Sequence, residues 1–191
     1  KAFEQVREEY RQRRAASSSD TGRGIFFVRI DPHQTVTLRL LTDVKDIDWV
    51  WTHRVADGSE YGRQTVCLDQ EGTGQVDCPG CDDGLPRDFR FFVNVIWRNS
   101  PIAKKDEEGK VVRVDGKTVT EGYGDQVAVF EKGHQVFEDL IGLESKFNEG
   151  LTQWDIEVTR EKVKYPTYKV EVADPRGDPT ELTEDEQALA A

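Results

Sequence analysis

Three cysteines and one histidine in the first half of the chain have the spacing of a metal site. Cys78 and Cys81 flank a Pro-Gly pair, a spacing that lets one tight turn direct both sulfurs at one ion, and Gly80 supplies backbone freedom there. Cys67 lies eleven residues before Cys78, and His53 lies fourteen residues before Cys67. Three cysteines and one histidine complete the tetrahedron of a zinc ion and leave no position open for a substrate. The sequence therefore predicts one structural zinc ion.

Alternatives to this interpretation remain for the pair and for the fourth ligand. A Cys-x-x-Cys pair is also a redox motif, but that motif opens a helix, and the Leu-Pro-Arg-Asp segment after Cys81 is a poor helix start. His33, which follows Pro32, and His134, which opens a helical pattern, could replace His53 as the fourth ligand. We favour His53 because it alone precedes the cysteines at the spacing of a zinc ribbon.

The composition predicts a soluble cytoplasmic binding protein. The 191 residues are 33% charged and 36% hydrophobic, which suffices for one packed domain with a strongly solvated surface. No apolar run approaches the roughly 20 residues that span a bilayer, and no secretory leader is recognisable. The odd number of cysteines argues against a disulfide framework. No phosphate-binding glycine loop, nucleophile elbow or open metal site is present, so no enzymatic activity is predicted.

The two ends of the chain carry opposite charge on an acidic body with a net charge of −11. Residues 1–24 hold six basic and four acidic side chains, including the cluster Arg11, Arg13 and Arg14 before a flexible Ser-rich linker. Residues 174–191 hold one basic and six acidic side chains. We expect a basic arm and an acidic tail with separate electrostatic roles, although both are also compatible with plain solvated termini.

The body between these ends, residues 25–173, has the pattern of a mainly β fold. Short segments rich in β-branched and aromatic residues alternate with turn signals, and one amphipathic helix comes late in the chain. This pattern favours an OB-type β-barrel, or otherwise a sandwich, with a zinc-bearing insertion at 53–84. The expected strands are 24–30, 35–42, 48–55, 88–98, 126–133, 154–163 and 167–172, with a small hairpin in 111–119 and the helix at 134–147.

The strand at 88–98 also has the pattern of a nucleic-acid surface. Its odd positions are all apolar and are expected to face the core. Its even positions, expected to face solvent, are Arg90, Phe92, Asn94, Ile96 and Arg98. An aromatic ring between cations suits stacking on bases and neutralising of phosphates, although each aromatic alone is more often core filler. Further candidates for this surface are Trp49, Trp51, Tyr61, Arg63, Lys104 and Lys105.

Several of these motifs together resemble a known family. His53, Cys67 and the CPGC of 78–81, followed by FRFFVNVIW and a late WDIEVTR…TYKV, resemble the single-stranded DNA-binding proteins of tailed phages. The resemblance covers about residues 24–173 and is specific at the metal site. It implies an OB fold with a zinc ribbon inserted near the DNA groove, in which one histidine and three cysteines hold the zinc in this chain order.

The resemblance also implies a function. It implies sequence-tolerant binding of single-stranded DNA in replication or recombination, in the cytoplasm of an infected bacterial host. The basic arm with Arg11, Arg13 and Arg14 would mediate self-association along DNA, and the acidic tail 174–191 would bind replication and recombination proteins. The acidic body departs from this pattern, because a DNA groove should be basic. That acidity favours the alternative, a zinc-stabilised adaptor or virion-assembly protein. A zinc-dependent nuclease or polymerase accessory enzyme is a third possibility, disfavoured by the closed ligand set.

Overall fold

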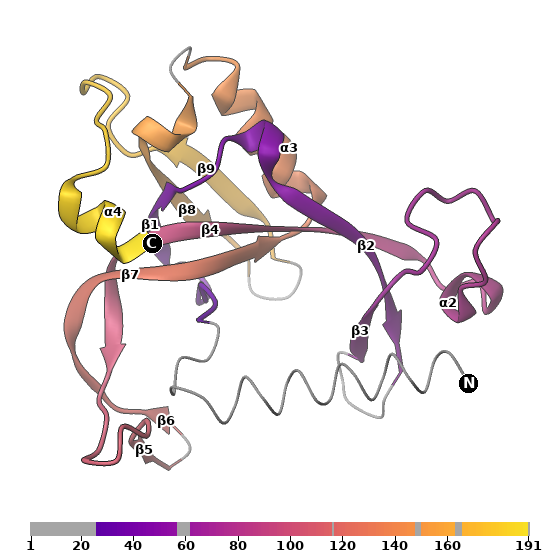
Figure 1. Ribbon diagram of the computed structural model, residues 1–191, viewed down its shortest axis with the longest axis horizontal. Helices are drawn as coiled ribbons and strands as arrows, with labels where there is room; N and C mark the ends of the chain where they lie inside the picture. The colour runs from indigo at the N-terminus through magenta and orange to yellow at the C-terminus, as the bar shows by residue number, and fades with distance from the viewer. Residues whose placement is uncertain (1–25, 57–61, 116, 148–149, 163–165, 191) are drawn as a thin grey trace.

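The computed structural model describes residues 26–56, 62–115, 117–147, 150–162 and 166–190. The described chain is mainly antiparallel β-sheet with few helices, which confirms the mainly β class (Figure 1). Its strands are β1 (Thr35–Leu40), β2 (Asp48–Val55), β3 (Arg63–Val66), β4 (Arg87–Ala103), β5 (Arg113–Val114), β6 (Lys117–Thr118), β7 (Thr120–Lys132), β8 (Asp155–Arg160) and β9 (Tyr168–Val172). Its helical segments are η1 (Val44–Asp46), α2 (Pro79–Asp82), α3 (His134–Glu144), η2 (Leu151–Gln153) and α4 (Glu184–Ala190).

The long strand β4 organises the sheet. One of its edges pairs with β7 along most of its length, from Phe91 to Ala103. Its other edge pairs first with β2, where Trp49 lies opposite Phe91, and then with β1, where Leu38 lies opposite Trp97. The strands β1 and β2 therefore follow one edge of β4 as two parts of an interrupted strand, and η1 lies in the excursion between them.

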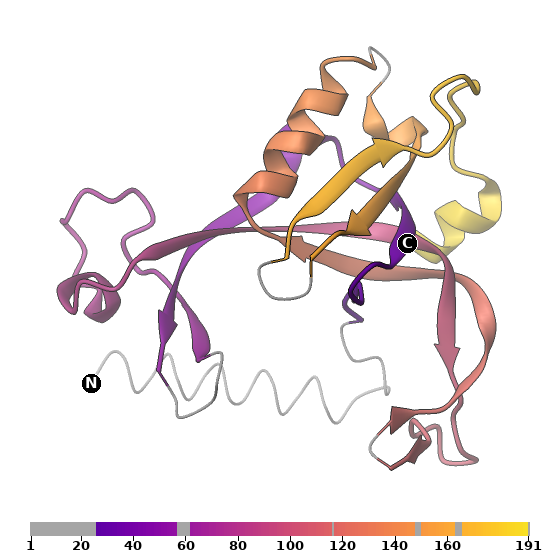
Figure 2. The same cartoon turned by 180° about the vertical axis from the view of Figure 1, so that it is seen from behind.

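The sheet does not close into a barrel. From β1 it continues through β8 to β9, and beyond β7 the chain adds a single parallel bridge between Phe27 and Val129. Among the described residues no strand pairing joins these two sides, so the expected closed OB barrel is not observed. The chain leaves β7 at Gly133 and turns directly into α3, which packs on β9, β4 and η1 (Figure 2). The helix thus lies where further strand pairing would be needed for closure.

The core fills the concave side of this sheet beneath α3. Fully buried side chains come from the central strands, from β8 and from the helix, and the odd positions of β4 supply the expected inward row. Fully buried core residues include Leu38, Leu40, Phe91, Val95, Phe130, Leu140 and Ile156. The helix was predicted correctly within a few residues, because its apolar positions recur at helical spacing.

Ile96 differs from its prediction. This even position of β4 was expected to face solvent, but it is fully buried. In the β1–β4 register it lies opposite Arg39, which is itself buried and donates hydrogen bonds to the carbonyl and hydroxyl oxygens of Thr180. The C-terminal segment therefore covers part of the outer face of β4, which strand alternation alone does not reveal.

The bounds of three predicted strands also differ. The strands β4 and β7 extend beyond 88–98 and 126–133 and form a two-stranded arm that ends in the β5–β6 hairpin (Figure 1). The hairpin was predicted, and its turn residue Asp115 has a positive φ of 50°. Of the expected strand at 24–30, the described residues 26–30 form only the bridge at Phe27. In the described part of the chain, no helix is long and apolar enough to cross a membrane.

Candidate functional site

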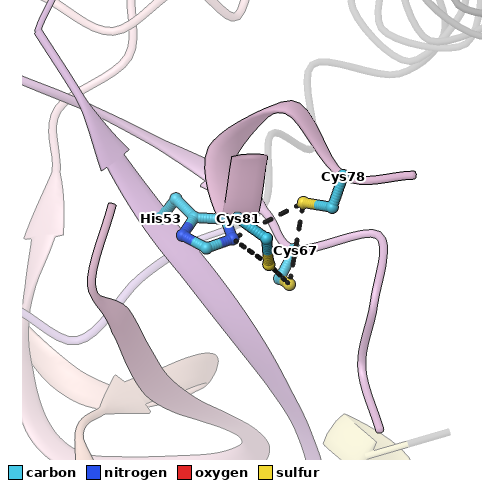
Figure 3. Close-up of side chains that lie close together, drawn as sticks. All are labelled: His53, Cys67, Cys78 and Cys81. Carbon is cyan, nitrogen blue, oxygen red and sulfur yellow. Dashed lines mark hydrogen bonds between the residues drawn. The ribbon is translucent and has the colours of Figure 1, made fainter. Parts of the chain in front are cut away.

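The four predicted metal ligands meet at one end of the sheet. His53 lies near the end of β2, Cys67 directly follows β3, and Cys78 and Cys81 bracket the start of the short helix α2 (Figure 3). All four donor atoms lie within 4.8 Å of one another. His53, Cys67 and Cys78 are buried and Cys81 is partly exposed. The structure thus confirms that these four side chains form one cluster that can hold a metal ion.

The separations within the cluster fit a tetrahedral ion. Cys67 Sγ lies 3.8 Å from Cys78 Sγ and 3.6 Å from Cys81 Sγ, and His53 Nε2 lies 3.5 Å from both Cys78 Sγ and Cys81 Sγ. Bonds of about 2.3 Å to sulfur and about 2.0 Å to nitrogen place tetrahedral ligands about 3.5–3.8 Å apart. A disulfide would instead bring two sulfurs to about 2.05 Å. The geometry therefore favours a shared ion over a redox pair.

The backbone around the cluster orients the ligands. His53 Nδ1 lies 3.2 Å from the carbonyl oxygen of Pro86, which suits an Nδ1–H donor and leaves the Nε2 lone pair directed at the sulfurs. The backbone N–H of Leu68 donates to Cys78 Sγ at 3.4 Å, as it would to a thiolate. Such outer contacts fix ligand orientation in metal sites, so these backbone groups would orient His53 and Cys78 toward a bound ion.

The thiols have unequal acidities. Burial raises the pKa of Cys78, but hydrogen bonds from the backbone of Cys81, Leu68 and Asp69 outweigh it and lower that pKa to about 6. Burial and the neighbouring sulfurs of Cys67 and Cys78 raise the pKa of Cys81 to about 12. Three thiols this close cannot all ionise without a compensating cation, whereas a bound metal deprotonates its thiol ligands. The cluster is thus chemically suited to a divalent cation.

Gly80 serves the site through its lack of a side chain. A Cβ atom at this position would lie 2.5 Å from Cδ2 of His53, so the imidazole packs directly on the Gly80 backbone. The residue is not among those with positive φ. Close approach, and not the backbone freedom predicted from the sequence, is therefore what requires glycine here.

The loop that carries the cysteines has polar supports that the sequence analysis missed. The carboxylate of Asp69 accepts backbone hydrogen bonds from Gly72, Thr73 and Gly74; these lower its pKa, with Arg87 adding to the fall and burial opposing it. The Gln70 amide exchanges hydrogen bonds with the backbone of Trp51 on β2.

A guanidinium completes these supports. Arg87 on β4 donates to the carbonyl oxygens of Asp69 and Gln70, and its guanidinium lies 4.8 Å from the centre of the Trp51 ring. A buried Asp followed by two glycines was the available sequence signal for this loop, because such a carboxylate commonly caps a turn. We call residues 62–86, with these supports, the metal lobe.

The two alternative histidines lie away from the cluster. His33 occupies a turn with a φ of 62°. His134 opens α3, where its ring contacts Phe89 and its Nε2 lies 3.4 Å from a carboxylate oxygen of Glu138. Neither is among the residues whose donor atoms gather with the three cysteines.

The predicted DNA-binding residues do not share one surface. Trp49 lies opposite Phe91 in the β2–β4 register, so Trp49 and Trp51 lie on the core side of the sheet. Arg90 and Phe92 lie on the opposite side. The exposed Arg63 comes from β3, and the exposed Lys104 and Lys105 come from the far end of the arm, next to the β5–β6 hairpin. Tyr61 lies outside the described residues, as do Arg11, Arg13 and Arg14, which were predicted for self-association.

Among the predicted aromatics that the structure describes, Trp49 is the most exposed. Its side chain is 48% exposed and stacks on Phe89 with ring centres 5.6 Å apart. Phe89 in turn contacts Phe137 of α3 and His134. An aromatic row thus runs from the core to an exposed indole beside the metal lobe.

Phe92 and Arg98 have acidic surroundings. Phe92 lines a small cavity of about 180 Å³ together with Asp46 and Asp48. Arg98 is 18% exposed and forms ion pairs with Asp125, Asp155 and Glu186. Burial lowers the pKa of Arg98, but the hydrogen-bonded carboxylates more than offset this and raise it. These two residues are therefore poorly placed to receive a polyanion.

The metal cluster and the aromatic row are the features of this chain from which a function can be argued. No match was found between the chain and any protein-family model, curated protein or solved structure.

Proposed function

We propose that this chain is a zinc-containing, sequence-tolerant single-stranded DNA-binding protein that acts in phage DNA replication or recombination in the infected cell. The zinc ion, held by His53, Cys67, Cys78 and Cys81, is structural, because four protein ligands leave no position for a substrate. The chain is accordingly a binding protein and not an enzyme. Its open sheet is a divergent OB-type barrel in which α3 replaces the closing strand contacts, and the metal lobe is its zinc ribbon.

The observation that carries the proposal is the half-exposed Trp49 at the end of the aromatic row. Stacking of bases on such rings binds single strands irrespective of sequence, because every base offers a π-face. Arg63 on β3 is exposed and lies opposite Val55, six residues further along β2 than Trp49, so it can meet a phosphate further along a strand that follows β2. The basic arm with Arg11, Arg13 and Arg14 remains the predicted element for self-association, and the acidic tail the predicted element for partner proteins.

Filter binding with single- and double-stranded oligonucleotides of equal length at two salt concentrations tests this proposal. Single strands should bind more tightly, and the affinity should fall with salt because phosphate contacts release counterions.

Trp49→Ala should cost about 1–3 kcal/mol in single-strand affinity with an unchanged salt slope, because stacking releases no counterion. Phe92→Ala, on the opposite side of the sheet, is the matched control. If Phe92→Ala loses affinity and Trp49→Ala does not, the single strand binds the side of the sheet that carries Phe92. If wild type binds duplex and single strand equally well, the proposal is contradicted.

A specific observation also favours the protein-binding adaptor. Three apolar side chains of the metal lobe, Val66, Leu68 and Val76, are about half exposed. Apolar residues gathered on a metal-stapled lobe are typical of protein contacts. Replacing Val66 and Leu68 by Ser should leave single-strand affinity unchanged if the lobe contacts proteins, and should weaken it if the lobe forms part of the DNA groove.

A further inference from the structure

A basic cleft lies where the sheet stays open. Its volume is about 530 Å³, within the range of small-ligand sites. It is lined by residues 27–29, the end of β7, the first turn of α3, and Pro166 and Tyr168, together with Arg90 of β4. Figure 2 shows β9 beside the start of α3 at this opening. The absence of strand pairing between β7 and β9 thus leaves a recess that a closed barrel would lack.

Cations from three separate segments line this basic cleft. Arg29 precedes β1, Arg90 lies on β4, and Lys132 ends β7. In the described ranges no carboxylate lies within ion-pair distance of any of the three, although Glu131 also lines the cleft. In a chain of net charge −11, cations gathered without such partners create a local positive potential that suits an anion.

Lys132 is held in place without an acidic partner. Its ammonium group donates to the carbonyl oxygen of Glu131 and lies 4.8 Å from the centre of the Phe130 ring and 5.3 Å from that of Tyr168. Burial, and then the positive charges of Arg90 and Arg160, lower its pKa to about 8, while Glu131 opposes this fall. A bound anion would relieve both the repulsion and the desolvation.

The start of α3 adds to this potential. Its N-cap residue is Gly133, which offers no side-chain hydrogen bond, and its first turn contains no acidic residue. The free N–H groups of a helix start carry partial positive charge. This helix start borders the same space as Lys132, because Gly133, His134 and Gln135 also line the cleft.

We propose that this cleft is a nucleotide subsite, in which Arg29, Arg90 and Lys132 hold a phosphate group and Phe27 offers its ring to the base. Phe27 lines the cleft and is 40% exposed. The cleft also adjoins the aromatic row, because His134 lines it and contacts Phe89, on which Trp49 stacks. The nucleotide is either a unit of a bound single strand, in which case the inference rests on the proposed function, or a free mononucleotide.

Two charge-removing variants test the subsite. Fluorescence polarisation with a labelled oligothymidylate and calorimetric titrations with thymidine monophosphate and inorganic phosphate are run on wild type, Lys132→Gln and Arg29→Gln. Each variant should weaken nucleotide binding about tenfold, since each removes a charged hydrogen bond. The salt slope for the oligomer should also fall by about one. Arg29 is exposed, so Arg29→Gln reports on binding even if Lys132→Gln perturbs folding.

Lys169→Gln is the matched control, because Lys169 is the exposed neighbour of Tyr168 and is already paired with Glu171. It should leave all three titrations unchanged. Displacement of the oligomer by thymidine monophosphate assigns the cleft to the strand, whereas binding without displacement assigns it to a free nucleotide.

The failures of the subsite and of the proposed function are distinguishable. If wild type binds the oligomer and both variants bind every ligand equally well, the subsite is overturned and single-strand binding stands. If wild type binds no oligomer, the proposed single-strand binding is wrong. The subsite is then tested by the titrations with thymidine monophosphate and inorganic phosphate alone. Saturable binding of these two ligands that the variants lose supports the subsite, and the absence of any binding overturns it.

Discussion

The metal lobe and the sheet beneath α3 are built on different physical principles. The sheet buries a continuous set of large apolar side chains, with Phe91, Phe130 and Leu140 fully inaccessible to solvent. In the metal lobe the buried residues include Cys67, Cys78 and Asp69, while apolar side chains such as Val66 lie exposed. Burial of apolar area can stabilise the sheet on its own, whereas the lobe depends on polar contacts and on its ligand cluster. The comparison predicts that one region can unfold while the other persists.

Removal of the metal should have the largest effect. Binding of a structural zinc ion contributes about 10–16 kcal/mol in small zinc domains, and in this chain it acts on the metal lobe. Wild type should contain one zinc ion per chain, and Cys78→Ser should contain none. Hydrogen exchange should then accelerate across residues 62–86, while β4 beyond Phe91 stays protected.

A chelator applied to wild type provides the control for the cysteine change itself. It should reproduce the exchange pattern of Cys78→Ser without altering the sequence. Full protection of the metal lobe from exchange in metal-free protein would show that the contacts of Asp69, Gln70 and Arg87 keep it folded. The lobe would then not depend on its metal, and the contrast with the sheet would be lost.

Phe91→Ala should have the next largest effect, and on the opposite region. Removing this fully buried ring leaves a cavity, and we expect the free energy of unfolding to fall by about 3–5 kcal/mol with the zinc content unchanged. Chemical denaturation and metal analysis measure the two quantities. Its counterpart is Gly80→Ala, whose added methyl group clashes with His53. That variant should weaken metal retention and leave β4 protected; loss of zinc from Phe91→Ala would instead couple the regions.

The metal ligands could be predicted from sequence because their chemistry is local. Cys78 and Cys81 fall within one turn, and few side chains can complete a tetrahedron with them. The reason for Gly80 could not be predicted, since the atom it must avoid belongs to His53, on a strand distant in sequence. The spacing of the cysteines therefore predicts which residues form the cluster. How closely they pack depends on where β2 places His53 relative to α2.

The elements of the sheet were predictable to different degrees. The bounds of β2 follow from its aromatic and β-branched composition, and the structure agrees with 48–55. The two-stranded arm of β4 and β7 was missed because Asn99, Pro101 and Gly124 are typical of turns, and backbone hydrogen bonds between two strands need no apolar pattern. The closed barrel was predicted wrongly because closure depends on whether β7 pairs with β9. These strands are far apart in the sequence, and no single segment shows whether they pair.

The surface prediction was limited by the same non-local information. Alternation placed Arg98 on the outer face of β4 but could not reveal the carboxylates of Asp125 and Asp155 beside it. Lys132 was overlooked because a single lysine at a strand end has no distinctive pattern. Its importance depends on the rings of Phe130 and Tyr168, which surround it in space.

Lys132 gives a smaller test of the difference between the two regions. It lies in the sheet, and burial of its charged ammonium group destabilises this region, whereas burial of apolar side chains stabilises it. The pKa of Lys132 is about 8 in the folded chain and 10.5 without these surroundings. Between these values the unfolded chain binds more protons than the folded one, so the free energy of unfolding should rise as pH increases from about 8 to 10.5. The rise should be about 2–3 kcal/mol, and Lys132→Met should lack it. Denaturation of both proteins across this range measures the difference, and parallel pH profiles would contradict it.

Glu186→Gln should have the smallest effect, and it tests whether the acidic tail competes with DNA. Glu186 of α4 pairs with Arg98, and its pKa is lowered by hydrogen bonds from Thr183 and Arg98, although burial opposes the fall. Asp125 and Asp155 still hold Arg98 when Glu186 is neutral, so stability should fall by only about 0–1 kcal/mol. Single-strand affinity should stay the same, because Arg98 keeps two carboxylates and lies on the side of the sheet opposite Trp49; a rise with a steeper salt slope would show that the tail competes with DNA. The point change is preferable to deleting the tail, because deletion also removes Thr180 from the buried Arg39 and uncovers the sheet. Weaker binding by Glu186→Gln would show that the tail supports the DNA-binding conformation, and unchanged binding would show that Arg98 lies away from the strand.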